Sequence, residues 1–199
     1  MSLPCNLGDF VSRTGAPDRP LIIGLDGDGA TRVMTRTAFD ALADAFARGL
    51  LKRGIRRGER IAILAANRPD YVAVFMGAMR AGIVPVPVNF KFPAATIAQV
   101  IADSGARLVV HDEERLAALS GPALPGVERV AFDGEGEGSL AAWLDPGPFE
   151  PVTPAPGETA LSLYTSGSTG RPKGVLLSHA SHLWVAKTRM EETDLSGAR

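Results

Sequence analysis

A single cysteine, Cys5, occurs among the 199 residues, so no disulfide can form within the chain. It is not accompanied by a cluster of Cys and His side chains, which argues against a structural zinc site. Chains with so little cysteine are typical of reducing compartments. The composition therefore argues against a disulfide-stabilised extracellular domain.

Long apolar runs are also missing. The uncharged stretches 71–79 and 81–90 are too short to cross a bilayer, and Pro85 and Pro87 interrupt the second one. The first ten residues lack the basic segment and the apolar segment that together form a secretory signal. We therefore expect no transmembrane segment and a cytoplasmic location.

Neither sign of charge dominates the chain. The 21 basic and 22 acidic side chains leave a formal net charge of -1, which lacks the positive potential of a general nucleic-acid binder. We expect no nucleic-acid partner. With 45% hydrophobic and 22% charged residues, the chain has the composition of an ordinary globular protein of one larger domain or two small ones.

Short apolar segments alternate with helical segments along the first two thirds of the sequence. Apolar residues recur at spacings of three and four in the helical segments, as on one face of a helix. The expected strands are 61–65, 83–88, 107–110 and 127–132, and the expected helices are 37–54, 69–81, 93–104 and 113–119. This alternation predicts an α/β fold, with a mainly parallel sheet flanked by helices.

A β-hairpin is expected before the first helix. Residues 21–24 and 32–34 are strand-like, and the cluster from Asp26 to Gly29 between them suits a tight turn. The same cluster could be taken for a calcium loop, but Ala30 stands where an EF-hand needs Asp or Asn. The turn is the favoured interpretation.

The helix expected at 37–54 begins with Thr37 and Asp40 placed like a capping box, and Gly54 ends it. Many cations lie at and after its end. They could form a patch for a phosphate backbone, or simply complement the helix dipole at a solvated helix end, which we favour. These residues are Arg48, Lys52, Arg53, Arg56, Arg57 and Arg60.

A proline-rich segment divides the sequence. Five prolines lie between residues 146 and 157, where they remove backbone donors and favour extended chain. We expect a first α/β subdomain at 1–145, a connection at 146–157, and the start of a second, truncated subdomain with a phosphate-binding loop at 158–199.

The loop of that second part is the most unusual segment. A strand-like stretch, 159–164, leads into TSGSTGRPKG at 165–174. Its three glycines allow backbone amides to approach an anion, and its hydroxyls and Lys173 add donors, so the loop suits phosphate oxygens. It does not match the Walker A pattern, because Pro172 stands at the second glycine position and Gly174 at the Ser/Thr position. A plain Gly/Ser surface hairpin is the alternative.

The whole string YTSGSTGRPKGVLLSH, residues 164–179, resembles the phosphate-binding motif of the adenylate-forming superfamily, which includes acyl-CoA synthetases, luciferases and peptide-synthetase adenylation domains. Ser181 and His182 depart from the family pattern, where an Asn is usual. Four segments earlier in the chain resemble the first subdomain of these enzymes: 35–50, 58–64, 67–71 and 77–82. Two further segments, 86–89 and 104–107, look more like stand-alone acyl-CoA synthetases than peptide-synthetase domains.

This resemblance implies an ATP-dependent carboxylate–CoA ligase of the fatty-acid-CoA ligase type, which forms an acyl-adenylate and then an acyl-CoA thioester. ATP and Mg²⁺ would be required, coenzyme A would be the co-substrate, and a small carboxylic acid the substrate. The residues that would hold the β- and γ-phosphates are Thr165, Ser166, Gly167, Ser168, Thr169, Gly170 and Lys173. No catalytic residue or metal ligand is assigned, because the family's magnesium motif and distal lysine have no counterpart in these residues.

The remaining chemistry-bearing residues of this region are expected to be structural. His179 and His182 lack the neighbours of a metal site, and Ser178 is expected to cap the helix that they begin. Core positions are expected for two groups of apolar residues. These are Leu183, Trp184 and Val185 in one helix, and Leu140, Trp143 and Leu144 in another.

Family members are more than twice as long as this sequence, so we expect the 199 residues alone to lack ligase activity. A non-catalytic module that binds nucleotide, phosphate or a protein is the alternative function. A truncated sheet would leave an apolar face near Leu161, Leu163, Val175 and Leu177 that favours self-association or a partner protein.

Overall fold

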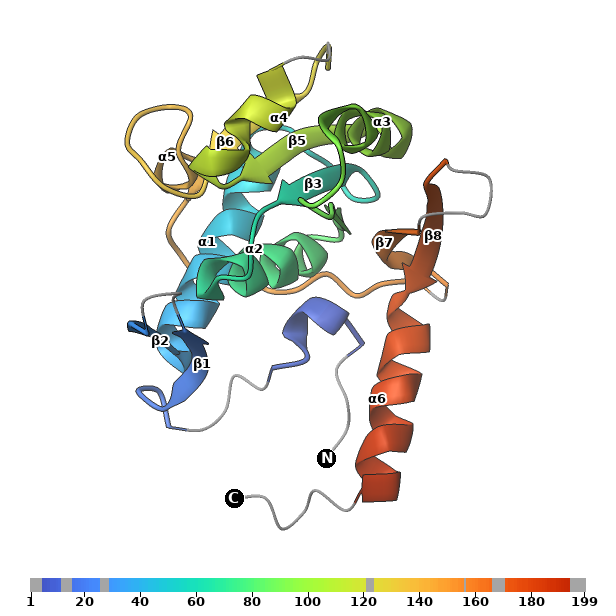
Figure 1. The fold of residues 1–199 in the computed structure, drawn as a ribbon. Helices are drawn as coiled ribbons and strands as arrows, with labels where there is room; N and C mark the ends of the chain where they lie inside the picture. Colours follow the sequence, from blue (N-terminus) through green and yellow to red (C-terminus); the bar gives the residue numbers. More distant parts are fainter. Residues whose placement is uncertain are drawn as a thin grey trace.

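The computed structural model describes residues 5–11, 16–25, 29–120, 124–155, 157–165 and 171–193. Its centre is a four-stranded parallel sheet in the order β4-β3-β5-β6 (Figure 1). The strands are β3 (Arg60–Leu64), β4 (Val84–Pro87), β5 (Ala106–His111) and β6 (Glu128–Ala131). The predicted α/β fold with a parallel sheet is therefore confirmed.

Helices cover both faces of this sheet (Figure 1). Side chains of β3 alternate between the two faces: Ile61 and Ile63 pack in a cluster with α1 and α2, and Ala62 and Leu64 pack in one with α3 and α4. This alternation is the two-residue period of a strand that is buried on both sides. The helices are α1 (Arg36–Lys52), α2 (Pro69–Arg80), α3 (Ala94–Ser104), α4 (Leu116–Ser120), which follows the 3-10 turn η2 (Glu113–Arg115), and α5 (Leu140–Trp143).

The first helix begins differently from the prediction. Thr35 is the N-cap of α1, and its side chain accepts a hydrogen bond from the amide of Ala38. The hydroxyl of Thr37 instead donates to the carbonyl of Pro17, and Asp40 binds Arg80. The capping box of Thr37 and Asp40 is therefore wrong, because the helix starts directly at the end of the preceding strand.

The predicted hairpin is confirmed. Strand β1 (Pro20–Leu25) pairs antiparallel with β2 (Thr31–Thr35), and Met34 is buried against α1 and α2. Asp26 of the expected turn, and with it part of the alternative calcium loop, lies outside the described residues.

The basic residues after α1 bind later parts of the chain. Arg48 and Lys52 both form ion pairs with Asp145, and Arg57 pairs with Glu158. Arg53 donates to the carbonyls of residues 142 and 143 and lies over the Trp143 ring. Lys52, Arg53 and Arg57 are exposed at the helix end, as the favoured interpretation expects, and the cations there also hold the chain from 142 to 158 against the first helix.

The last described part of the chain is a second, antiparallel hairpin followed by a helix. Strand β7 (Thr159–Thr165) pairs with β8 (Lys173–Ser178), and α6 (His179–Thr193) leads away from the hairpin past the 3-10 turn η1 (Leu7–Asp9) (Figure 1). Ala160 and Leu161 of β7 are buried with Met79 of α2. The hairpin therefore packs on the helices of the parallel-sheet part.

Several burial predictions for this region need correction. Leu161 is buried and Leu177 packs beside it, so the exposed apolar residues of the hairpin are Leu163, Val175 and Leu176. On α6, Leu183 is buried as expected, but Trp184 is 67% exposed and Val185 is also exposed. The contacts of α6 with η1 and β8 therefore leave these two side chains uncovered. The predicted core positions of Leu140, Trp143 and Leu144 are confirmed.

No helix in the described parts of the chain has both the length and the apolar character that a bilayer span requires.

Candidate functional site

The predicted phosphate-binding loop connects β7 to β8. The two strands are antiparallel, and their register places Thr165 opposite Lys173 at the end where the loop begins. Both residues are exposed. The other predicted loop residues, Ser166, Gly167, Ser168, Thr169 and Gly170, lie outside the described residues. The hairpin thus brings one hydroxyl and one ammonium group of the predicted set to the same end of the hairpin.

Lys173 offers its charge without a protein partner in the described structure. Its ammonium forms no hydrogen bond or ion pair with any other described residue. A lysine that is exposed and unpaired at the mouth of a glycine-rich loop can bind an anion as a flexible point charge. The arrangement therefore suits the role predicted from the motif.

Tyr164 and Gly174 explain why the hairpin has this shape next to the loop. The two residues are cross-strand partners, and a Cβ atom at position 174 would lie 3.0 Å from Cζ of the tyrosine ring. A larger side chain at position 174 would therefore press on the ring, which would have to shift by a few tenths of an ångström. The tyrosine hydroxyl donates a 2.6 Å hydrogen bond to Oδ2 of Asp103 in α3.

The environment keeps that hydroxyl protonated. Partial burial, and then the nearby Asp103 carboxylate, raise the pKa of Tyr164 above its ordinary range. A pocket of about 370 Å³ lies between this end of the hairpin and the parallel-sheet part. Its lining includes Arg60, Asp103, Ser104, Gly105, Ser162, Tyr164, Gly174 and Leu176.

His179 has the structural role that the sequence predicts. It is buried, and its Nδ1 atom accepts a hydrogen bond from the amide of Leu7. Ser178 caps α6 by accepting a hydrogen bond from the amide of Ser181. Across the described ranges, no three His, Cys, Asp or Glu side chains gather in a way that could hold a metal ion.

A second polar cluster lies at the carboxyl ends of β3, β5 and β6. Arg68, directly before α2, forms ion pairs with Asp70, Asp112 and Asp133 and lies over the Phe132 ring. The ion pair lowers the pKa of Asp133. Arg68, Asp112 and Asp133 line a pocket of about 350 Å³ beside the point where the strand order reverses, the usual ligand position in open α/β sheets. At this pocket the Arg68 guanidinium is already paired with Asp112 and Asp133.

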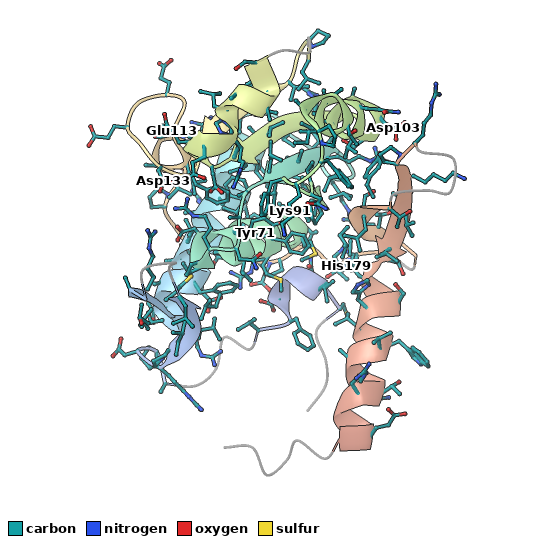
Figure 2. All side chains as sticks on the ribbon, viewed as in Figure 1. Tyr71, Lys91, Asp103, Glu113, Asp133 and His179 are labelled. Carbon is teal, nitrogen blue, oxygen red and sulfur yellow. The ribbon has the colours of Figure 1, made fainter. Side chains whose placement is uncertain are left out.

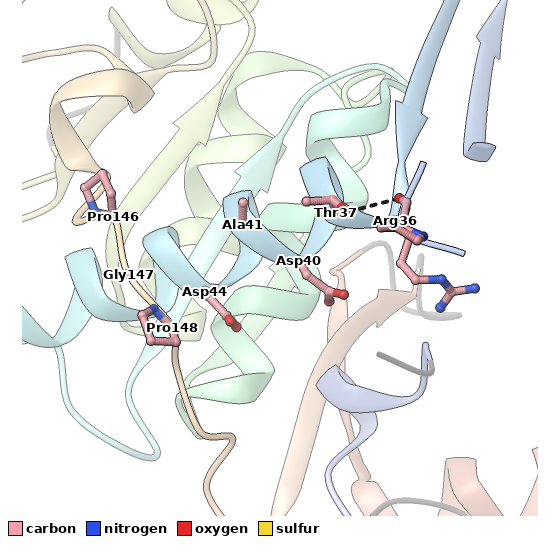
Figure 3. Close-up of a pocket in the computed structure, with 9 residues that line it drawn as sticks. Arg36, Thr37, Asp40, Ala41, Asp44, Pro146, Gly147 and Pro148 are labelled. Atoms are coloured by element: carbon pink, nitrogen blue, oxygen red, sulfur yellow. Dashed lines mark hydrogen bonds between the residues drawn. The ribbon is translucent and has the colours of Figure 1, made fainter. Parts of the chain in front are cut away.

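Another pocket, of about 440 Å³, lies between the first half of α1 and residues 146–148 (Figure 3). Asp40 and Asp44 face it, but both carboxylates bind Arg80.

Figure 2 places Asp133 at the sheet and Asp103 near the hairpin, so the polar groups at the predicted loop come from α3, β7 and β8. The sequence analysis did not single out Asp103 or Arg68, because partners distant in sequence give no local pattern.

Comparisons with known proteins agree with the motif. A family model described as AMP-binding enzyme matches residues 11–198. Feruloyl-CoA synthase of Amycolatopsis sp is 37% identical over 150 residues, which cover 75% of this chain and 29% of that protein. An L-proline–[L-prolyl-carrier protein] ligase of Pseudomonas fluorescens is 40% identical over 132 residues, which cover 65% of this chain and 26% of that protein.

The fold is also that of a solved relative. The crystal structure of apo MatB from Rhodopseudomonas palustris matches with a TM-score of 0.75 and 25% identity, over 94% of this chain and 37% of that chain. The present chain spans between about a quarter and a third of the length of the two curated relatives. Since the family model matches nearly the whole chain, the protein belongs to the AMP-binding enzymes, the adenylate-forming superfamily that the motif resembles.

Proposed function

We propose that this chain is the N-terminal part of an ATP-dependent carboxylate–CoA ligase of the fatty-acid-CoA ligase type. The observation that supports it best is the β7–β8 hairpin, whose register places Thr165 and Lys173 on the two sides of a loop with the family's phosphate-binding sequence. The names of the relatives favour a ligase over the non-catalytic module that we considered as the alternative.

In the proposed first step, a carboxylate oxygen of the substrate attacks the α-phosphorus of ATP. The bond to the β-phosphate bridging oxygen breaks, so that an acyl-adenylate forms and pyrophosphate leaves. A thiol then attacks the acyl carbon, and AMP leaves with the bonding electron pair as the thioester forms. No residue of this chain is assigned to proton transfer.

The loop's role in this step would be electrostatic. Backbone amides and hydroxyls from Thr165 to Gly170, together with the Lys173 ammonium, would hold the β- and γ-phosphates and stabilise the charge that accumulates on departing pyrophosphate. Charge stabilisation of this kind needs fixed donors rather than an acid or a base. The exposed, unpaired Lys173 fits this role.

The metal ion and the thiol acceptor complete the proposed reaction. Mg²⁺ is proposed from the family resemblance alone, since the described residues bring no three His, Cys, Asp or Glu side chains together that could hold a metal ion. Coenzyme A is the proposed acceptor, since one relative is named a CoA synthase; another is named a carrier-protein ligase. The proposed location is the cytoplasm, and fatty acid metabolism the proposed context.

We further propose that residues 1–199 alone are inactive and that the exposed apolar side chains of the hairpin favour self-association. Leu163 and Val175 are exposed cross-strand partners on one face of the hairpin, whereas the exposed Leu176 lies on the opposite face. Apolar groups that lie together on a surface, as Leu163 and Val175 do, are typical of contact sites. Sedimentation velocity should show concentration-dependent association that Val175→Ser reduces. A wild-type chain that stays monomeric at high concentration would contradict this part.

The main test has two arms. Isothermal titration of the 199-residue chain with ATP measures whether the loop binds a triphosphate. ATP–pyrophosphate exchange by the whole gene product then measures adenylation, with ferulate, 4-hydroxybenzoate, proline and a long-chain fatty acid as trial substrates. We expect ATP binding by the chain and exchange that depends on one class of carboxylate. Exchange that is absent with every acid, together with no ATP binding, would refute the proposal.

A further inference from the structure

Asp103 and Tyr164 join two parts of the molecule next to the predicted loop. Asp103 lies in the last turn of α3, and Tyr164 is the last residue but one of β7, 61 positions later. Figure 2 shows Asp103 at the end of α3 that lies nearest the β7–β8 hairpin. The hydrogen bond from the tyrosine hydroxyl to Oδ2 of Asp103 is 2.6 Å long, as is typical when the acceptor is ionised.

The tyrosine ring is held on a second side. It lies over Gly174, its partner in β8, and it packs at the edge of the apolar cluster between α3 and the sheet. Because Tyr164 directly precedes Thr165 and Gly174 directly follows Lys173, fixing this ring fixes the backbone on both sides of the loop mouth. Small displacements of anion-binding donors lower affinity and rate strongly.

Few side chains of this end of the hairpin are buried or hydrogen-bonded to the parallel-sheet part in the described structure. Ala160 and Leu161 anchor the distant end of β7 on Met79, but Leu163 and Thr165, near the loop, are exposed. In residues 163–165 and 171–177, the bond from Tyr164 to Asp103 is the one side-chain hydrogen bond that the described structure gives to the parallel-sheet part. Since β7 as a whole also lies against β4, this bond adds one directional polar contact next to the loop.

We propose that Asp103 is a positioning residue for the phosphate-binding loop and acts through the hydroxyl of Tyr164. The inference rests on the proposed function and adds a residue from outside the motif. Asp103 contributes an acceptor in a fixed place. Its negative charge is not the useful property, because a carboxylate near the loop opposes the binding of phosphate oxygens.

The charge and the acceptor are separable by substitution. Asp103→Asn keeps an oxygen at the same distance from the backbone and removes the charge, whereas Asp103→Ala removes both. Tyr164→Phe keeps the ring over Gly174 and removes only the donor. Tyr71→Phe is the matched control, because Tyr71 is partly buried against Phe75 of α2, in the apolar cluster on the other face of the sheet from Tyr164.

The experiment titrates ATP, and separately inorganic tripolyphosphate, into the wild-type 199-residue chain and each variant. Asp103→Ala and Tyr164→Phe are expected to weaken both affinities about 3- to 30-fold, the range of coupling through a positioning contact. The double variant, with Asp103→Ala and Tyr164→Phe together, should lose no more affinity than either single variant. Asp103→Asn and Tyr71→Phe should stay within about twofold of wild type.

Two results would overturn the proposal. One is an affinity of Tyr164→Phe for ATP and tripolyphosphate that equals that of the wild type. The other is an affinity of Asp103→Asn that is as weak as that of Asp103→Ala. If the wild-type chain binds neither ATP nor tripolyphosphate, the phosphate-binding role itself fails, and amide hydrogen exchange decides the positioning role separately. Exchange at residues 163–165 and 173–175 should then be faster in Tyr164→Phe and Asp103→Ala than in Asp103→Asn, and equal exchange in all of them would contradict it.

Discussion

The Nδ1 atom of His179 accepts a 2.9 Å hydrogen bond from the backbone amide of Leu7, a residue 172 positions earlier in the chain. The histidine, labelled in Figure 2, is the first residue of α6. Leu7 is the first residue of η1. The bond requires a neutral ring, because a protonated Nδ1 would present a hydrogen to the Leu7 amide instead of a lone pair. The two distant ends of the chain are therefore joined by a contact that depends on pH.

This contact predicts a loss of stability in mild acid. Burial is the main cause that lowers the pKa of His179 below its ordinary 6.5, while Glu158 raises it and Arg57 lowers it further. Below pH 6.5 the unfolded chain binds a proton that the folded chain resists, so the free energy of unfolding falls as the pH falls from 6.5 toward the lowered pKa.

Urea unfolding between pH 7.5 and about pH 5 tests this through a comparison. His179→Asn keeps an acceptor at nearly the position of Nδ1 but does not titrate. As the pH falls, the free energy of unfolding should decrease more for the wild type than for His179→Asn. A difference that stays constant over this range would show that His179 does not resist protonation in the fold.

Arg80 provides a second prediction, about stability. Its side chain is completely buried, and it binds Asp40 and Asp44 of α1 and the carbonyl of Gly8. Removing one partner of a buried ion pair leaves uncompensated charge and costs about 3–5 kcal/mol. Arg80→Ala is therefore expected to lower the free energy of urea unfolding by roughly that amount.

The matched control is Arg107→Ala. Arg107 pairs with Glu59, but its side chain is 53% exposed, so water screens the interaction. Its loss should cost less than about 1 kcal/mol. Equal losses in the two variants would mean that the Arg80 cluster contributes no more than a surface pair.

Gly77 provides a third prediction, about helix packing. A Cβ atom at this position of α2 would lie 2.4 Å from the carbonyl oxygen of Ala43 in α1, so the two helices would have to move apart. Gly77→Ala is expected to lower the free energy of unfolding by about 1–3 kcal/mol, although alanine favours helix. Gly138→Ala is the control, because nothing lies within 4 Å of its added Cβ. A stabilised Gly77→Ala would contradict this packing.

Much of the fold could be predicted from the sequence because its patterns are local. The apolar segment from Ile61 and the helical spacing after Pro69 each depend on residues a few positions apart, and the structure has β3 and α2 there. Thr35 was missed as the cap because Thr37, two residues later, also fits the pattern of a helix start. Trp184 was misplaced because the type of residue indicates burial only when another element covers it.

The site was predictable only where it lies in one stretch of sequence. Thr165 and Lys173 follow from the motif, and the register of the hairpin then brings them together. Asp103 could not be found in this way, since it meets Tyr164 through the packing of α3 against the hairpin. Arg68 was missed for the same reason: its partners Asp112 and Asp133 follow two other strands.

Lys173 carries the last prediction, about the proposed reaction. It is one of four lysines, is exposed at the loop end of β8, and pairs with no described residue, so its charge is free for an anion. Lys173→Ala should lower the rate of ATP–pyrophosphate exchange by the whole gene product about ten- to a thousandfold, because a fixed cation then no longer stabilises departing pyrophosphate. Lys173→Arg should recover only part of the rate, since guanidinium cannot occupy the position of an ammonium.

Lys187→Ala, on the exposed side of α6, removes the same charge at a distance from the loop and should leave exchange unchanged. An exchange rate that is equally insensitive to Lys173→Ala and Lys187→Ala would mean that the loop holds the phosphates through its backbone and hydroxyls alone.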